Sequence, residues 1–433
     1  MSPSIVALLG FAALFLLIVL HVPLAIAMMI VGACGFAVLV GPEPASALFA
    51  DDVASVLGSP DMAIIPLFLL MGSFAGAAGL SADLYRFANA FVGHWRGGLA
   101  MATIGGCAGF GAVCGSSLAT VGTMVRVAHP EMLARGYAPH FSAGTIAVGG
   151  TLGLMIPPSI IMVLYAVLTE TFVIDLYIGA IVPGLLAVLL YFVAIHWWAR
   201  RHPVEAPRGS RSDWRARRKA AAEAGGVITM VFVVTGGMYG GIFTATEAAA
   251  IGAFVAFLFL VLRGRFDARE FWRMIVGVAA TTGMIYMMVI GASVFNYFVA
   301  VSHVPEQLLG WITASNIPHL AILALILALY IVLGAVFDET ATMLITLPFV
   351  LPLVLGFGYD AVWWGIVNVV VITIGLICPP IGLNVLVLAG LLRRIAVRKI
   401  YAGIVPFLAM DVVRLALLLL FPALVTWLPG TMR

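Results

Sequence analysis

Two pairs of adjacent prolines, Pro157-Pro158 and Pro379-Pro380, interrupt long apolar segments of the sequence. Proline lacks the amide donor of a helix and its ring clashes with the preceding turn, so each pair must break a helix that reaches it. Inside a membrane such breaks survive only where protein or a hydrated site satisfies the freed carbonyls. Those carbonyls can coordinate a small cation, and the free amides of a half-helix that starts nearby can hold an anion.

Polar side chains lie in two further apolar stretches. Ser116 and Ser117, within GAVCGSSLAT, can cap a helix or offer hydroxyl groups to a ligand. Asp338 and Glu339, within GAVFDETAT, are carboxylates that favour an ion, a proton or a polar substrate, although Asp338 can also cap a helix. Asn384 follows the second proline pair and can contact a polar substrate or brace the backbone. The substrate-binding candidates are Ser116, Ser117, Asp338 and Asn384.

Three other ionisable residues lie in or beside apolar segments. Asp411 and Arg414 are three residues apart, so they share a helix face and can neutralise each other, which indicates a structural pair. Arg126 follows the serine-rich stretch and is interpreted as a snorkelling arginine, although it can also attract an acidic substrate.

The composition is that of a polytopic membrane protein. The 433 residues are 63% hydrophobic and 9% charged, against about 25% charged residues in an ordinary soluble domain. The four cysteines form no CxxC motif, and the eight histidines show no metal-ligand spacing. We therefore expect no catalytic residue and no cofactor.

The elements that must position these residues follow from the apolar periodicity. The predicted spans are 4–20, 23–40, 61–79, 141–172 (broken), 175–198, 225–243, 246–262, 272–300, 361–391 (broken) and 401–428. The stretches 98–127 and 320–352 are too rich in Gly and polar residues to be simple spans, and we predict re-entrant helical hairpins there. The predicted fold class is thus an all-α polytopic membrane protein.

With the N-terminus outside, 20 of the 22 Lys and Arg residues fall in loops on the cytoplasmic side. The positive-inside rule therefore assigns an external N-terminus. The basic run at 200–224 is interpreted as a cytoplasmic linker that faces anionic lipid of the bilayer, and not as a nucleic-acid site.

The two proline segments align at an offset of 222 residues, and the order of predicted elements repeats. The first copy begins outside and the second begins inside, so we predict two inverted-topology repeats, 1–199 and 225–433, joined by the linker at 200–224. Inverted repeats with matching interruptions indicate a secondary transporter whose binding site lies near the membrane midplane.

Three motifs, AVCGSSLATVGTMVRVAHPEM, GGTLGLMIPPSIIMVLYAVLTE and GLICPPIGLNVLVLAG, resemble those of the large membrane subunit of TRAP (tripartite ATP-independent periplasmic) transporters. The resemblance implies an elevator-type secondary transporter of the bacterial inner membrane, with a periplasmic N-terminus and a sodium gradient as its driving force. It also implies two partners: a separate small four-helix membrane subunit, and a periplasmic binding protein that delivers an organic acid.

The resemblance further implies two sodium sites made mostly of backbone carbonyls. The first maps to Gly111, Cys114, Gly153, Ile156 and Pro158, and the second to Gly334, Gly375, Cys378 and Ile381. The family commonly has Ser at the position of Cys114 and Thr at that of Cys378. A thiol is a poor ligand for a hard cation, so Cys378 gives the second site sulfur where the family pattern has a hydroxyl oxygen.

Other functions fit the sequence less well. A one-component carboxylate transporter of related architecture, which works without a binding protein, is the alternative in mechanism. An ion channel lacks support because no selectivity-filter repeat is present. An intramembrane enzyme lacks support because there is no G-x-S-x-G elbow and no second acidic motif to accompany Asp51-Asp52.

Overall fold

The computed structural model describes residues 2–315 and 317–432, and within these ranges every regular element is a helix. The first half contains α1 (Pro3–Val19), α2 (Leu24–Leu39), α3 (Pro42–Gly58), the 3₁₀ helix η1 (Pro60–Ala63), α4 (Ile64–Ala77), α5 (Leu80–Val92), α6 (Gly98–Cys114), α7 (Ser117–Ala134), α8 (Pro139–Met155), α9 (Ile160–Thr169) and α10 (Val173–Arg201). The second half contains α11 (Trp214–Tyr239), α12 (Ala245–Leu262), α13 (Ala268–Val301), α14 (Val304–Ala314), α15 (His319–Val336), α16 (Glu339–Gly356), α17 (Ala361–Gly375), α18 (Leu383–Leu391), α19 (Val397–Leu420) and α20 (Ala423–Thr431).

Helix length and hydropathy confirm a multi-pass membrane protein. Among the described residues, nine segments are long and apolar enough to cross a membrane, and four shorter apolar helices accompany them. The longest, α13, has 34 residues, about 50 Å at the α-helical rise. Its charged side chains, Arg269, Glu270 and Arg273, are confined to its N-terminal end, in keeping with the cost of burying charge in lipid.

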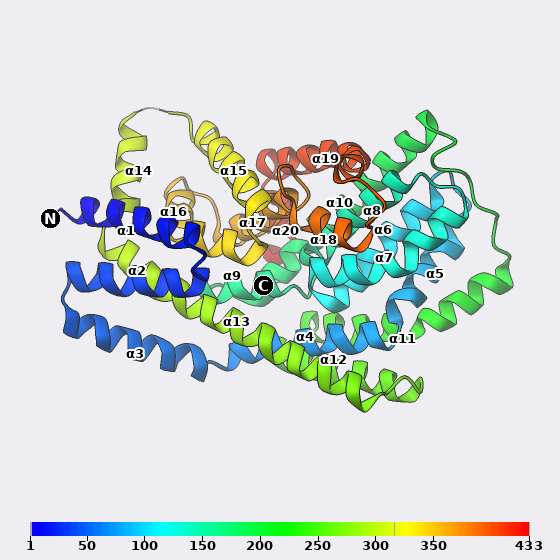
Figure 1. Ribbon diagram of the computed structural model, residues 1–433, viewed down its shortest axis with the longest axis horizontal. Coiled ribbons are helices and arrows are strands. Elements are labelled where there is room, and N and C mark those ends of the chain that lie inside the picture. Colours follow the sequence, from blue (N-terminus) through cyan, green and yellow to red (C-terminus); the bar gives the residue numbers. More distant parts are fainter. Residues whose placement is uncertain (1, 316, 433) are drawn as a thin grey trace.

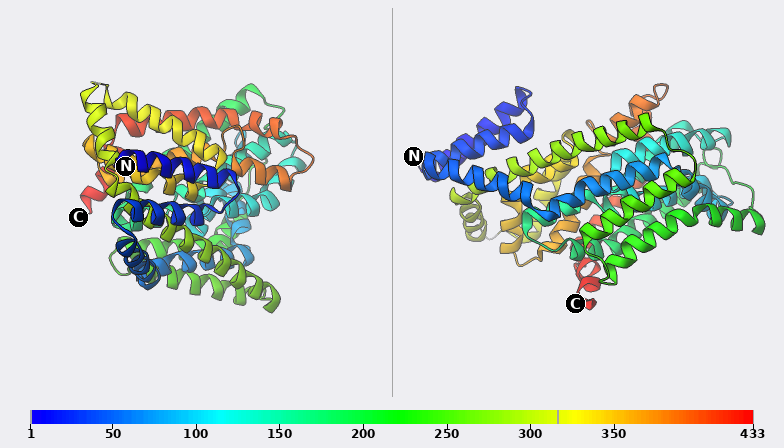
Figure 2. Two further views of the ribbon diagram at one scale, coloured as in Figure 1. Left: turned by 60° about the vertical axis from the view of Figure 1, so that its left-hand side comes forward. Right: turned by 90° about the horizontal axis from the view of Figure 1, so that it is seen from below.

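The helices group into two assemblies, which we call the frame and the hairpin body. The frame comprises α1–α4 and α11–α14, in which α4 packs against both α12 and α13 along the lower edge of Figure 1. Helix α5 packs against α11 of the frame and, more extensively, against α6 of the hairpin body. The hairpin body comprises α6–α10 and α15–α20 and lies above this layer. Figure 2, seen from below, shows the frame helices in front of the hairpin body.

Local sequence signals explain where the frame helices begin. Thr244 and Glu247 form a reciprocal capping box at the start of α12, and Asp267 accepts hydrogen bonds from two backbone amides at the start of α13. Near the other end of the frame, buried Asp83 of α5 pairs with both Arg86 and Arg263. This ion-pair group fixes the short helix α5 against the end of α12.

The helices of the hairpin body begin and end close to the predicted positions, whereas the re-entrant character of the two hairpins stays a prediction. Helices α6 and α7 form the first predicted hairpin and α15 and α16 the second, with bounds close to 98–127 and 320–352. The 141–172 segment is broken into α8 and α9 at Pro157-Pro158, and the 361–391 segment into α17 and α18 at Pro379-Pro380. The inverted orientation of the repeats stays a prediction.

Three helices were not predicted. Helices α3, α5 and α14 are short and amphipathic or weakly apolar, so they lack the long apolar window that identifies a span. Helix α11 begins at Trp214, within the predicted 200–224 linker, because Asp213 caps it by accepting from the Ala216 amide at 2.7 Å. The predicted 401–428 span consists of two helices, because α19 ends just before Pro422 and α20 begins just after it.

One ion pair lies in the interior of the hairpin body. Arg414 Nη2 is 2.8 Å from Asp411 Oδ1, and each side chain is only 1% exposed. Tyr191 of α10 donates its hydroxyl to the same carboxylate oxygen at 2.7 Å. The predicted Asp411–Arg414 pair is thus present, and the tyrosine uses it to join α19 to α10.

Removal of one charge from this pair is expected to destabilise the protein strongly, because the remaining buried charge loses its ionic partner. Arg414→Met should lower the free energy of unfolding by about 3–5 kcal/mol, measured by thermal unfolding in detergent. The double variant Asp411→Leu with Arg414→Met should recover most of that loss. A single variant as stable as the parent would contradict a structural role for the pair.

Candidate functional site

The first hairpin closes directly around the first helix break. A Cβ atom added at Gly111 of α6 would lie 2.7 Å from the Cα of Gly153, so the two backbones touch. Gly153 also faces α7, because a Cβ there would lie 2.7 Å from the Ser116 carbonyl oxygen. At the hairpin turn, Gly115 has a φ of 62°, and an added Cβ would lie 2.9 Å from the Pro158 carbonyl oxygen. Glycine is required at these positions for the hairpin to reach the break.

The second hairpin approaches the second break in the same way. A Cβ added at Gly375 of α17 would lie 2.7 Å from the Cα of Gly334 in α15. The Gly382 amide, just after the proline pair, donates to the Ala335 carbonyl at 3.0 Å. The structure therefore brings Gly334 and Gly375 together, as it does Gly111 and Gly153.

The two breaks differ in what their carbonyls bind. Pro157 and Pro158 have no N–H group, so the carbonyls of Gly153 and Leu154 lose the donors that an unbroken helix would give them. At the second break the equivalent carbonyls find donors within the protein: Gly375 accepts from the Cys378 amide at 3.0 Å, and Leu376 from the Asn384 amide at 3.1 Å. The first break consequently offers a cation more unused carbonyl oxygen than the second.

The remaining residues of the two predicted sodium sites lie close to these breaks. Cys114 ends α6 and is buried, with its backbone packed against Gly72 of α4. Ile156 follows α8 directly and is half-buried. Cys378 is half-buried in the second break, where the Ile381 carbonyl already accepts a hydrogen bond from the Tyr401 hydroxyl at 2.7 Å.

Two of the predicted substrate-binding residues bind each other. The Asn384 amide nitrogen donates to Ser117 Oγ at 2.7 Å and to the Ala147 carbonyl at 3.1 Å, and Ser117 and Asn384 are both 0% exposed. This triad joins the start of α7 and the middle of α8 to the start of α18. In this conformation Asn384 braces the backbone, and a solute would reach either side chain only after the pair opens.

The other two candidates cap the second arms of the hairpins. Ser116 Oγ accepts from the Ala119 amide at 3.5 Å, and Asp338 Oδ1 accepts from the Ala341 amide at 2.8 Å. Ser116 also lines a cavity, so it keeps a position from which it can contact a solute. Glu339, beside Asp338, has a buried Oε2 atom without a hydrogen-bond partner.

This cavity, which we call the basic cavity, lies between the frame and the first hairpin. Its volume is ≈ 660 Å³, within the range of about 300–1,000 Å³ that is usual for small-ligand pockets. Its lining includes Cys114 and Ser116 at the hairpin turn together with two arginines, Arg126 of α7 and Arg265 before α13. The guanidinium of Arg265 lies over Gly79, where an added Cβ would be 1.9 Å from its Nη1.

Arg265 was not a candidate from the sequence, since it was only one of many basic residues in predicted cytoplasmic loops. Arg126, the other arginine of the cavity, lies far from Arg265 in the sequence, so no local pattern connects the two. Two guanidinium groups in the lining of one cavity, one from the first hairpin and one from the frame, can bind a carboxylate or a similar anion.

Comparison with known proteins identifies the family. The sequence profile described as "Tripartite ATP-independent periplasmic transporter, DctM component" matches residues 11–424. The chain is 36% identical to the C4-dicarboxylate TRAP transporter large permease protein DctM of Pseudomonas aeruginosa over 84% of each chain. It is 33% identical to the isethionate TRAP transporter permease protein DctMQ of Oleidesulfovibrio alaskensis, covering 97% of this chain and 66% of that longer protein.

The fold also has a solved relative. The crystal structure of the YdaH transporter of Alcanivorax borkumensis matches with a TM-score of 0.66 and 15% sequence identity, over 89% of this chain and 90% of that one. The sequence relatives are permeases, so the chain is a transport protein and not an enzyme. With a profile match from residue 11 to residue 424, the chain belongs to the DctM family, the large permease subunits of TRAP transporters.

Proposed function

We propose that this chain is the large permease subunit of a sodium-driven secondary transporter that imports an organic acid delivered by a periplasmic binding protein. The observation that carries the proposal is the contact between the first hairpin turn and the first helix break, where Gly111 meets Gly153 and Gly115 meets Pro158. Unused backbone carbonyls and an arginine-lined cavity lie on the two sides of the same hairpin turn. A cation and an anionic solute can therefore bind close to one another.

Sodium is proposed to bind at the first break through the carbonyls of Gly111, Cys114, Gly153, Ile156 and Pro158. Carbonyl oxygen suits a hard cation, and the carbonyls of Gly153 and Leu154 lack helical donors. The second site, at Gly334, Gly375, Cys378 and Ile381, is proposed to be weaker. Part of its carbonyl oxygen is already hydrogen-bonded, and Cys378 offers sulfur where an oxygen ligand is preferred.

The solute is proposed to be an organic anion bound in the basic cavity. Arg126 and Arg265 supply the positive charge, and Ser116 supplies a hydroxyl group. Relatives of this chain are named for C4-dicarboxylates, isethionate and sialic acid, all of which carry an acidic group. The chemistry of the cavity supports this class of solute.

Two protein partners are proposed, a small four-helix membrane subunit and a periplasmic binding protein. The chain belongs to the large permease subunits of TRAP transporters, and that membership supports partners of both kinds. The alternative of a one-component carboxylate transporter is not favoured, because the relatives are named as TRAP permeases.

An elevator motion is proposed for the hairpin body relative to the frame. The frame helix α4 faces the first hairpin through small residues, with Gly72 against Cys114 and Gly76 against Phe110. Small residues let helix backbones approach closely and leave few interlocking side chains to obstruct sliding. Movement along α4 would carry the first break and the hairpin side of the basic cavity, with Ser116 and Arg126, across the membrane, whereas Arg265 stays with the frame.

Sodium is expected to stabilise the purified chain through the first break. In detergent, sodium chloride should raise the unfolding temperature more than potassium chloride, since about 100 Kd of a specific ligand adds about 2.7 kcal/mol. Gly111→Ala should abolish most of the sodium-specific increment, because the new Cβ forces α6 away from Gly153.

Gly105→Ala is the matched control, since Gly105 lies on α6 like Gly111. Its added Cβ would meet only the Ala88 side chain of α5, at an ordinary 3.4 Å. That variant should keep the sodium increment. Equal increments in both variants would place sodium binding elsewhere than the first break.

The two arginines of the basic cavity are expected to bind the acidic group of the solute. Arg126→Gln and Arg265→Gln should each weaken binding of succinate or isethionate to the purified chain about 10- to 100-fold, the loss expected for one charge-assisted hydrogen bond. Arg273→Gln, an exposed arginine outside the cavity lining, should leave the affinity unchanged. The same modest loss in all three variants would indicate a diffuse charge effect and would argue against the site.

A crosslink between frame and hairpin is expected to stop transport without removing ion binding. Gly72→Cys places a thiol against native Cys114, where the added Cβ would lie 3.1 Å from Sγ. Oxidation in a background without the other three cysteines should abolish uptake in proteoliposomes, and reduction should restore it. Gly72→Ser controls for the added bulk, and full uptake by the crosslinked protein would rule out the elevator motion.

A further inference from the structure

A second cavity lies between the frame and the hairpin body, at the opposite end of their contact from the basic cavity. It has a volume of ≈ 540 Å³ and is lined by residues of α3, η1, α9, the segment after α9, and α13. Along α13 the basic cavity uses Met274, whereas this cavity uses Val289 to Tyr297. Fifteen to twenty-three positions of helix separate them, roughly 20–35 Å at the α-helical rise. The positive-inside rule assigns the second cavity to the external side.

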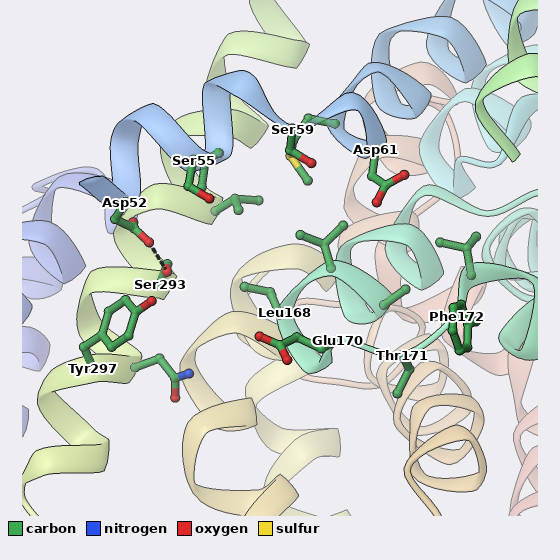
Figure 3. Close-up of a pocket in the computed structure, with 17 residues that line it drawn as sticks. Asp52, Ser55, Ser59, Asp61, Leu168, Glu170, Thr171, Phe172, Ser293 and Tyr297 are labelled. Atoms are coloured by element: carbon green, nitrogen blue, oxygen red, sulfur yellow. Dashed lines mark hydrogen bonds between the residues drawn. The ribbon is translucent and has the colours of Figure 1, made fainter. Parts of the chain in front are cut away.

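The lining of this acidic cavity is rich in oxygen and has no basic side chain. Three carboxylates, Asp52, Asp61 and Glu170, come from three different elements and are visible in Figure 3. Six further side chains offer hydroxyl or amide oxygen: Ser55, Ser59, Thr171, Ser293, Asn296 and Tyr297. Among the described residues no ion pair joins any of the three carboxylates to Lys, Arg or His. The cavity therefore carries uncompensated negative charge.

One carboxylate in this cavity is buried and only half satisfied. Asp52 is 7% exposed, and its Oδ1 accepts from Ser293 Oγ at 2.5 Å, the contact drawn in Figure 3. Its Oδ2 atom is buried without any hydrogen-bond partner. A buried carboxylate oxygen without a partner costs free energy, and a cation or an ordered water is what satisfies such a group.

Burial raises the pKa of the Asp52 carboxyl, and the hydrogen bond from Ser293 offsets part of that rise. An acid whose pKa is raised by folding stabilises the protein only while it is protonated, and this contribution is lost as pH increases. At neutral pH the ionised, buried Asp52 carboxylate therefore lowers the stability of the folded protein. Such a cost is expected where a group is kept for binding.

Helix α9 links the acidic cavity to the first break. It begins at Ile160, just after Pro157-Pro158, and ends at Thr169, where Glu170 lines the cavity. The C-terminal end of a helix carries partial negative charge, so α9 adds its dipole to that of the carboxylates. Ten residues of helix separate the two places, about 15 Å.

We propose that the acidic cavity is an external binding site for a small monovalent cation, with Asp52 as its anchor. The cavity is open and contains no compact cage, since no group of three metal-ligating His, Cys, Asp or Glu side chains occurs in the described part of the chain. The cation therefore keeps much of its water, and the site accepts potassium as well as sodium. This separates it from the break, which is proposed to prefer sodium.

Such a site would collect cations at the external mouth of the interface and repel an anionic solute that arrives without them. Clefts lined by charge of one sign raise the local concentration of counter-ions and speed their binding. The transport consequence depends on the sodium-driven function proposed above, whereas the cation site itself does not.

The test uses potassium as the probe, because potassium reports the cavity without filling the sodium site. The purified chain is unfolded thermally in potassium chloride and in N-methylglucamine chloride at equal ionic strength. The parent should unfold at a higher temperature in potassium, and Asp52→Asn should lose this difference while keeping the Ser293 hydrogen bond. In N-methylglucamine, Asp52→Asn should be at least as stable as the parent, which excludes simple misfolding.

Asp51→Asn is the matched control, since Asp51 is an exposed neighbour outside the cavity lining. Asp51→Asn should retain the potassium effect. Asp52→Asn should lose the potassium effect but keep the additional rise in unfolding temperature that sodium gives over potassium. In proteoliposomes, Asp52→Asn should raise the external sodium concentration for half-maximal uptake about tenfold, the lower end of the range for electrostatic focusing.

Three outcomes would overturn the proposal: no potassium effect in the parent, an unchanged effect in Asp52→Asn, or the same loss in Asp51→Asn. If the parent shows the potassium effect but no additional sodium increment, the sodium-driven function fails while the acidic cavity stands. If sodium acts but potassium does not, the function stands and the cavity proposal fails.

Discussion

The architecture depends on one constraint: inside a membrane, each backbone carbonyl and amide must find a partner within the protein. A helix satisfies this automatically, and the chain gives up that solution at Pro157-Pro158 and Pro379-Pro380. Each break is then enclosed by a helical hairpin whose glycines touch the broken helix, Gly111 at Gly153 and Gly334 at Gly375. The hairpins thus cover the breaks within the protein. Without them the freed carbonyls would face lipid.

The two breaks satisfy the constraint in different ways. The second uses internal donors, the amides of Cys378 and Asn384 and the hydroxyl of Tyr401. Both proline pairs lack N–H groups, but in the described part of the chain no other amide replaces the missing donors for Gly153 and Leu154 at the first break. A protein that binds a cation at one break and satisfies its carbonyls internally at the other would need this difference. The Ser117–Asn384 contact then joins the first hairpin to the helix that follows the second break.

Much of the fold followed from the sequence because its signals are strong and local. Long apolar windows, paired prolines and glycine-rich turns located both hairpins and both broken helices. The short helices α3, α5 and α14 escaped because amphipathic segments lack such windows. Of the site, the meeting of Gly111 with Gly153 was foreseeable through the family resemblance. Neither the pairing of Arg126 with Arg265 nor the burial of Asp52 against Ser293 has a local signal, since each joins residues far apart in the chain.

The central claim is that unused carbonyls at the first break bind sodium. The most direct measurement is a pair of high-resolution cryo-electron microscopy maps of the purified chain, one in sodium and one in potassium. The account predicts a density peak in sodium that the carbonyl oxygens around Gly153 and Pro158 surround, and a weaker peak or none in potassium. An empty first break in sodium, with its carbonyls hydrogen-bonded to protein groups, would contradict the account.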